Sequence, residues 1–183
     1  MTRELRLHVA TRKGLFTLER DARGWRIEKV AFEGDNVPML LPDARDGALY
    51  AVVGHGHFGS KLFRGAASGD EFVPIPAPEY PPKPSHEVDV DPVRGTERRW
   101  SLDLVWALEA GGAERPGRLW AGTVPGGLFR SDDRGQSWEL VRALWDRAER
   151  KQWFGGGLDD PGIHSVVVDP RDPDHLLIGI SCG

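Results

Sequence analysis

The sequence has little cysteine, no excess of basic charge and no long apolar run, and each of these absences excludes a class of protein. Its 183 residues include one cysteine, Cys182, which excludes an internal disulfide and a zinc site built on several cysteines. The net charge is −4, with 24 basic and 28 acidic side chains interspersed. A chain without a polybasic face is not expected to bind nucleic acid or an anionic membrane.

The apolar residues are spread over many short segments. No stretch approaches the roughly 18 apolar residues of a membrane span, and the opening MTRELRLHVATRKG lacks the apolar run of a signal peptide. We therefore expect a cytoplasmic protein that does not contact a membrane. The 23 glycines, 14 prolines and seven tryptophans fit many short strands joined by turns.

A Leu-Phe pair recurs three times and marks an internal repeat. The copies are KGLFTLERDARGW (13–25), SKLFRGAASGDEF (60–72) and GGLFRSDDRGQSW (126–138), each with an aromatic residue nine positions after the Phe. Each is preceded by a second strand-like segment (LRLHVAT, ALYAVVG and RLWAGT), and a third type of segment recurs as VPMLLPD, LVWALEA and IHSVVVDP. The repeat reads as strands A to D of a four-stranded unit, with the Leu-Phe pair on strand C.

Four-stranded repeats of about 40–50 residues are typical of a β-propeller. We predict an all-β fold, a β-propeller of four-stranded antiparallel blades, with about three blades and a partial fourth forming a single partial propeller over 1–183. The predicted limits are 5–32 for blade 1, 37–76 for blade 2, 102–143 for blade 3 and 163–183 for the partial blade 4, with insertions at 77–101 and 144–162.

The third copy contains S-x-D-x-G-x-x-W, formed by Ser131, Asp133, Gly135 and Trp138. An Asp in a tight turn accepts hydrogen bonds from backbone N–H groups, and Gly supplies a positive φ. We expect Asp133 to bind the turn and Trp138 to cover its hairpin, which are structural tasks. In the first copy Leu18, Arg20 and Ala22 stand at the first three positions.

This spacing resembles the Asp-box of the BNR-repeat β-propellers, a superfamily with sialidase-like, xyloglucanase-like and WD40/YVTN-like members. The segments TRKGLF and DDPGIHS resemble its cytoplasmic members that are described as exo-alpha-sialidases or glycosyl hydrolases without established activity. The Arg-Ile-Pro element of true sialidases is missing. Tyr50 and Tyr80 are the only tyrosines, and only Tyr80 has a neighbouring glutamate, Glu79, so the nucleophile pair of that family has weak support.

The strand count leaves blade 1 without strand A and blade 4 without strands C and D. Open blades leave unpaired edges, which proteins normally cover, and a closed ring needs four to eight blades. We expect the N-terminal part of a longer, seven-bladed propeller whose C-terminal half is missing here. The alternative is pairing with a second copy into one ring.

The long connections gather on one face of the predicted propeller, the face of the B–C and D–A loops. Long loops in compact domains are often functional, so we place a ligand site there. The candidate ligand-binding residues are Arg12, Lys13, His55, His57, His86, Glu87, Trp153 and His164.

Each candidate also has a structural interpretation. The weak metal candidates His55 and His57 are more simply two surface histidines, and we expect no metal and no cofactor. Asp89, Asp91 and Asp103 alternate with apolar residues, which predicts a solvated strand edge, with calcium as the less favoured interpretation. Trp106 and Trp120 fall within strands and predict packing, whereas Trp153 predicts an exposed aromatic platform.

These observations favour a propeller without established catalysis that binds a small molecule, a glycan or a protein. The alternative is a glycoside hydrolase whose remaining catalytic residues lie beyond this chain, because the carboxylate pair that such enzymes need is not recognisable in the sequence. We leave the catalytic residues unassigned.

Overall fold

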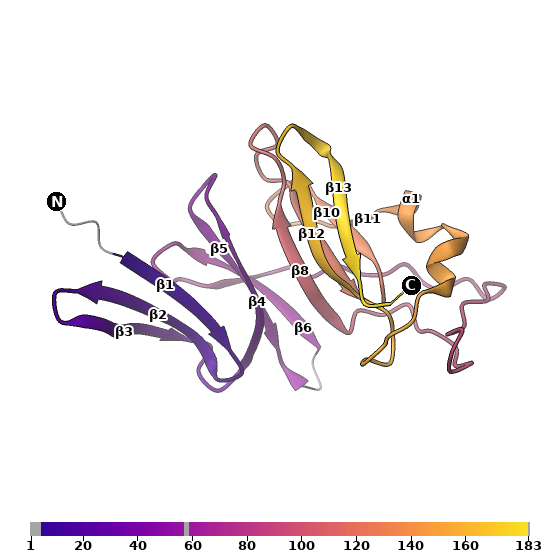
Figure 1. Ribbon diagram of the computed structural model, residues 1–183, viewed down its shortest axis with the longest axis horizontal. Coiled ribbons are helices and arrows are strands. Elements are labelled where there is room, and N and C mark those ends of the chain that lie inside the picture. Colours follow the sequence, from indigo (N-terminus) through magenta and orange to yellow (C-terminus); the bar gives the residue numbers. More distant parts are fainter. Residues whose placement is uncertain (1–4, 57–58, 183) are drawn as a thin grey trace. The chain divides into compact units, whose positions relative to one another are not determined.

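The computed structural model describes residues 5–56 and 59–182, which form four antiparallel sheets (Figure 1). The first sheet is β1 (Leu5–Thr11), β2 (Gly14–Asp21) and β3 (Gly24–Ala31); the second is β4 (Asn36–Asp43), β5 (Ala48–Gly54), β6 (Ser60–Ala66) and β7 (Val73–Ile75). The third is β8 (Leu104–Ala110), β9 (Leu119–Val124), β10 (Leu128–Ser131) and β11 (Glu139–Leu140); the fourth is β12 (Ile163–Asp169) and β13 (Asp172–Ile180).

The chain divides into two compact units. The N-terminal unit extends to Ile75 and holds the first two sheets, and the C-terminal unit begins at Pro76 and holds the other two. Two short helices, α1 (Arg142–Trp145) and a 3-10 helix (Ala148–Gln152), lie between β11 and β12. In the described part of the chain, no helix has the length and apolar character needed to cross a membrane.

The strand order follows the repeat predicted from the sequence. Each sheet is a meander in which consecutive strands pair, and the Leu-Phe pairs lie on β2, β6 and β10, the predicted C strands. The apolar runs of β5 and β9 are buried on both faces. The all-β prediction with four-stranded antiparallel sheets is therefore confirmed.

Each unit has its own apolar core between its two sheets. In the N-terminal unit, Leu15 packs with Val37, Ala51 and Val53. The C-terminal core has buried residues from β8, β9, β10 and β12. These are Ala107, Trp120, Leu128, Ile163 and Val166.

The turn between β10 and β11 has the hydrogen bonds expected of Asp133. Its carboxylate accepts the Ser137 N–H at 2.9 Å, while Ser131 Oγ accepts the Gly135 N–H at 2.8 Å. Gly135 has φ +81°, a conformation that glycine adopts without strain. Trp138 is half-buried, and its indole donates to the carbonyl of Pro76 at 2.9 Å. This tryptophan thus joins the hairpin to the segment after β7, a contact that the sequence did not predict.

Candidate binding surface

The predicted site residues of the N-terminal unit lie on one loop side. Arg12 and Lys13 form the exposed turn between β1 and β2, and the half-buried His55 follows β5. The Gly34 N–H donates to the Lys13 carbonyl at 3.1 Å, and His55 Nδ1 lies 3.7 Å from a carboxylate oxygen of Asp35. The connection between β3 and β4 therefore brings the Lys13 turn and the His55 loop together.

The metal interpretation of the two histidines is untested. His57 lies outside the described residues, so its position relative to His55 stays a prediction. Within the described ranges 5–56 and 59–182, no group of three or more His, Cys, Asp or Glu residues is arranged to hold a metal ion.

The candidates of the C-terminal unit have separate surroundings. His86 is exposed, and the carboxylate of Glu87 pairs with Lys151 Nζ at 2.6 Å. His164 is exposed on β12, with its ring edge-to-face against Trp106 at 5.7 Å between ring centroids. How these residues lie relative to those of the N-terminal unit stays a prediction.

Trp153 is not the exposed platform that the sequence suggests. Its indole is half-buried and packs against the core of the C-terminal unit. A Cβ at Gly126 would come within 3.1 Å of the ring, so the absence of a side chain at this position lets the backbone approach it closely. Trp153 is thus part of the packing beneath the loops.

The segment from Glu87 to Val93 buries two acidic side chains and exposes its valines, and we call it the inside-out segment. The prediction of a solvated strand edge at Asp89 and Asp91 is wrong, because these carboxylates are 0% and 2% exposed. Val88, Val90 and Val93 are instead 72%, 38% and 69% exposed. A segment that buries charge and exposes valine needs buried partners for the charge, and the structure supplies them.

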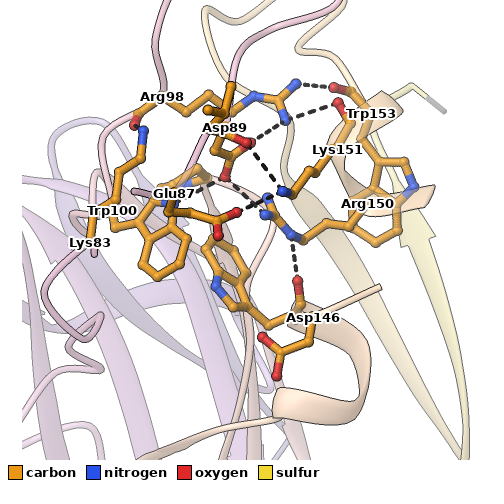
Figure 2. Close-up of polar contacts among 12 residues, drawn as sticks. Lys83, Glu87, Asp89, Arg98, Trp100, Asp146, Arg150, Lys151 and Trp153 are labelled. Atoms are coloured by element: carbon orange, nitrogen blue, oxygen red, sulfur yellow. Dashed lines mark hydrogen bonds and ion pairs between the residues drawn. The ribbon is translucent and has the colours of Figure 1, made fainter. Parts of the chain in front are cut away.

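Asp89 lies at the centre of a buried network that joins the two insertions (Figure 2). One oxygen accepts from Arg98 Nη1 at 3.2 Å. The other accepts from Arg150 Nη2 at 2.8 Å and from the indole N–H of Trp100 at 3.0 Å. Asp89, Arg98 and Trp100 belong to the first insertion (77–101), and Arg150 belongs to the second (144–162).

The two arginines extend the network to the backbone. Arg98 donates to the carbonyls of Lys151 and Trp153 in the second insertion. Arg150 donates to the Trp145 carbonyl at 2.7 Å, and its guanidinium carbon lies 3.9 Å from the centroid of the Trp145 ring. A guanidinium that donates to two acceptors and stacks on an aromatic ring, as Arg150 does, fixes geometry as well as charge. The two insertions are therefore held as one rigid assembly.

Tyr80 anchors the first insertion to the turn between β9 and β10. Its hydroxyl donates to the Pro125 carbonyl, accepts the Gly127 N–H at 3.0 Å and lies 2.5 Å from Thr123 Oγ1. Burial raises the pKa of Tyr80 well above its ordinary value. A phenolate nucleophile is thus disfavoured here, and Tyr80 has a structural role.

The ionisation of the network follows from its contacts. Burial by itself would raise the pKa of Asp89, but the hydrogen bond and charge of Arg150, with Trp100 and Arg98, outweigh burial and hold that pKa below its ordinary value. Burial by itself would also raise the pKa of Asp91. Hydrogen bonds from the N–H groups of Arg94 and Val93, followed by Arg98, outweigh burial and hold that pKa below its ordinary value. Both groups are therefore carboxylates near neutral pH.

The pKa values of Asp103 and Asp160 are shifted in the opposite direction, above the ordinary value. Burial and then the negative charge of Asp103 raise the pKa of Asp160, and burial raises the pKa of Asp103. One oxygen of Asp160 lies 3.8 Å from Nε of Arg98. This carboxyl pair could not be recognised in the sequence, because Asp103 precedes the strands of the third sheet in the chain and Asp160 follows them.

The comparisons with known proteins concern the fold. No protein-family model and no curated protein matches the chain. Among solved structures it is similar to a GH74 xyloglucanase from Xanthomonas campestris, at 18% identity and a TM-score of 0.59, over 97% of this chain and 24% of that one. It is also similar to a structure of YCF48 bound to D1 peptide, at 16% identity and a TM-score of 0.43, over 73% of this chain and 36% of that one. The likeness to the xyloglucanase confirms the β-propeller fold, and the chain spans only part of the length of either protein.

Proposed function

We propose that this chain is a binding module of a larger, seven-bladed propeller and that its insertions dock an apolar segment of another protein. The inside-out segment carries this proposal: Asp89 is buried, while Val88 and Val90 on either side of it face solvent. Exposed apolar side chains on a rigid support are typical of docking surfaces. The Asp-box assignment of the 131–138 turn, the blade limits and the cytoplasmic location stay part of the same proposal.

The buried network around Asp89 supports the binding proposal because it reduces the entropy that the two insertions would lose when a partner binds. Loops that must become ordered on association lose side-chain and backbone entropy, which weakens the complex. Here Arg98 and Arg150 already hold both insertions through Asp89 and through backbone carbonyls. The valines are thus presented in one conformation before a partner arrives.

The experiment is selection of a displayed random-peptide library on the full chain, followed by titration of the enriched peptides. We expect peptides with apolar side chains, and we expect Val88→Glu and Val90→Glu to weaken them at least about tenfold, equal to about 1.4 kcal/mol. The matched control is Val73→Glu, at an exposed position of β7 in the other unit, which should leave binding unchanged. Failure to enrich any peptide, or equal binding to all variants, contradicts the proposal.

A glycoside hydrolase is the second candidate, favoured by the coupling of Asp103 and Asp160. Glycosidases use two carboxyl groups, one of them with a raised pKa that lets it act as an acid. Xyloglucan oligosaccharides and sialyllactose are the substrates to incubate with the chain and with Asp160→Asn. Hydrolysis that disappears in Asp160→Asn would establish the hydrolase and overturn the binding-only proposal.

A further inference from the structure

Residues 88–99 of the first insertion fold back on themselves as a short antiparallel ribbon, which we call the insertion ribbon. Val90 pairs with Glu97, and the Arg98 N–H donates to the Asp89 carbonyl at 2.9 Å. Successive side chains of such a ribbon point to opposite sides. Asp89 and Arg98 share the buried side, where their side chains form an ion pair (Figure 2). The side chains of Val90 and Glu97 therefore lie on the solvent side.

The solvent side of the insertion ribbon also includes Val88 and Arg99. Val88 stands two residues before Val90, and Arg99 stands two residues after Glu97. Both side chains are exposed, as the alternation requires. The solvent side thus presents two valines from one half of the ribbon and a charged pair of residues from the other half.

A groove of about 510 Å³ lies beside the insertion ribbon. This volume is within the roughly 300–1,000 Å³ of clefts that bind ligands. Three of its five lining side chains are cationic and one is anionic, and the half-buried Trp100 supplies an aromatic surface. The lining residues are Lys83, Glu97, Arg98, Arg99 and Trp100.

Internal ion pairs leave Arg99 as the uncompensated charge of this groove. Lys83 Nζ pairs with Glu97 at 2.8 Å, and Arg98 pairs with the buried carboxylates of the network. Among the residues that the structure describes, none forms an ion pair or a side-chain hydrogen bond with Arg99. Arg99 attracts the carboxylate of Asp103, but burial outweighs this attraction and raises the pKa of Asp103. The groove therefore has an excess of positive charge, located on Arg99.

We propose that the segment that docks on Val88 and Val90 carries an aspartate or glutamate side chain, which binds Arg99 in this groove. The inference rests on the proposed docking function and names the chemistry of its partner. A guanidinium presents parallel N–H groups that match the two oxygens of a carboxylate. Complementary charge beside an apolar contact selects among partners that have similar apolar side chains. Arg99 is thus the residue that distinguishes acidic from basic segments.

Selection from two displayed random-peptide libraries tests the sign of this preference. One library encodes Asp and Glu but neither Lys nor Arg, and the other encodes Lys and Arg but neither Asp nor Glu. We expect the unmodified chain to enrich peptides from the acidic library at least about tenfold over the basic one. Arg99→Glu, with unchanged circular dichroism, should reverse this order. The matched control is Arg20→Gln, at an exposed position of β2 in the other unit, which should select as the unmodified chain does.

Titration of an enriched peptide, synthesised with an amidated C-terminus, then tests the contact itself. Replacing its acidic residue by the corresponding amide should weaken binding to the unmodified chain about threefold, as for an exposed ion pair. The same replacement should leave binding to Arg99→Gln unchanged, because the partner of the carboxylate is then absent.

The outcomes separate this inference from the docking function on which it rests. Equal enrichment from the two libraries, or an equal effect of the amide on both chains, would overturn the role of Arg99 while Val88→Glu still weakens the peptides. Binding that requires a free C-terminus would overturn it as well, because the carboxylate would then be that of the chain end. Enrichment from neither library would overturn both the inference and the docking function.

Discussion

At the scale of single residues, Asp89 determines how the two insertions are held. It accepts hydrogen bonds from two arginines and a tryptophan in a fully buried position. Removing one partner of a buried ion pair is costly, since the remaining charge is left without compensation. The two arginines would then lie buried around a neutral group.

We therefore expect Asp89→Asn to lower the free energy of unfolding by about 3–5 kcal/mol, measured by urea denaturation. The matched control is Asp160→Asn, because the folded state already disfavours the charge of Asp160. That variant should be as stable as the unmodified chain or slightly more stable near neutral pH. Equal losses in the two variants would show that Asp89 has no special place in the network.

The same groups predict how stability depends on pH. Asp160 has a raised pKa in the folded state, so its contribution makes stability increase as the pH falls from about 7 through that pKa. Asp89 and Asp91 have depressed pKa values, so the stability they give is complete above the ordinary Asp pKa of about 3.9 and is lost below it.

Urea denaturation as a function of pH tests both signs. We expect Asp160→Asn to flatten the rise in unfolding free energy between about pH 7 and about pH 4 while the acid decline remains. A profile of Asp160→Asn that coincides with that of the unmodified chain at every pH would contradict the raised pKa of Asp160.

At the scale of elements, the turn of residues 131–138 is stabilised by hydrogen bonds that its own sequence supplies. Asp133 accepts from the N–H and hydroxyl of Ser137, and Ser137 leads the interactions that lower the pKa of Asp133. We expect Asp133→Ala to cost about 1–3 kcal/mol, as for hydrogen bonds to a charged group. Gln136→Ala, at an exposed position of the same turn, should cost much less, and thermal unfolding compares the two. If Asp133→Ala lowers the free energy of unfolding no more than Gln136→Ala does, packing alone stabilises the turn.

The sheets could be predicted from the sequence because their information is local. Strand type and order depend on features that lie within a few residues of one another in the chain. These features are the Leu-Phe pairs, the continuous apolar runs of β5 and β9, and the turn residues. The insertion network is not local. Asp89 pairs with Arg150 in a different insertion, and the Val–Asp alternation is equally compatible with either side facing the solvent. Only the positions of the arginines decide which side is buried.

Candidate site residues were predicted less well for the same reason. The loop side was identifiable from the lengths of its connections, and the His55 loop and the Lys13 turn do meet the same connection. The exposure of Trp153 was misjudged, because its burial depends on the close approach of the Gly126 backbone. Such a contact between residues far apart in the chain is not visible in the amino-acid sequence.

At the scale of the whole molecule, each unit has an apolar core, and two segments also expose apolar side chains to solvent. The first sheet packs Leu15 into the core of its unit and exposes Leu7 and Ile27 on its other face. The Glu87–Val93 segment buries Asp89 and exposes Val88. Exposed apolar surface on this scale is unfavourable in water unless another surface covers it. These exposed apolar side chains are the basis of the proposed docking function.

Thiol labelling tests most directly the central claim that Val88 and Val90 face solvent. Val88→Cys and Val90→Cys, each combined with Cys182→Ser to remove the native thiol, should react with a maleimide at close to the rate of an unstructured peptide. Val53→Cys, in the core of the N-terminal unit, should react only after unfolding. Rapid labelling at positions 88 and 90 without denaturant is the result that the inside-out segment predicts. Protection of both positions to the level of position 53 would contradict it, because the valines would then face the interior.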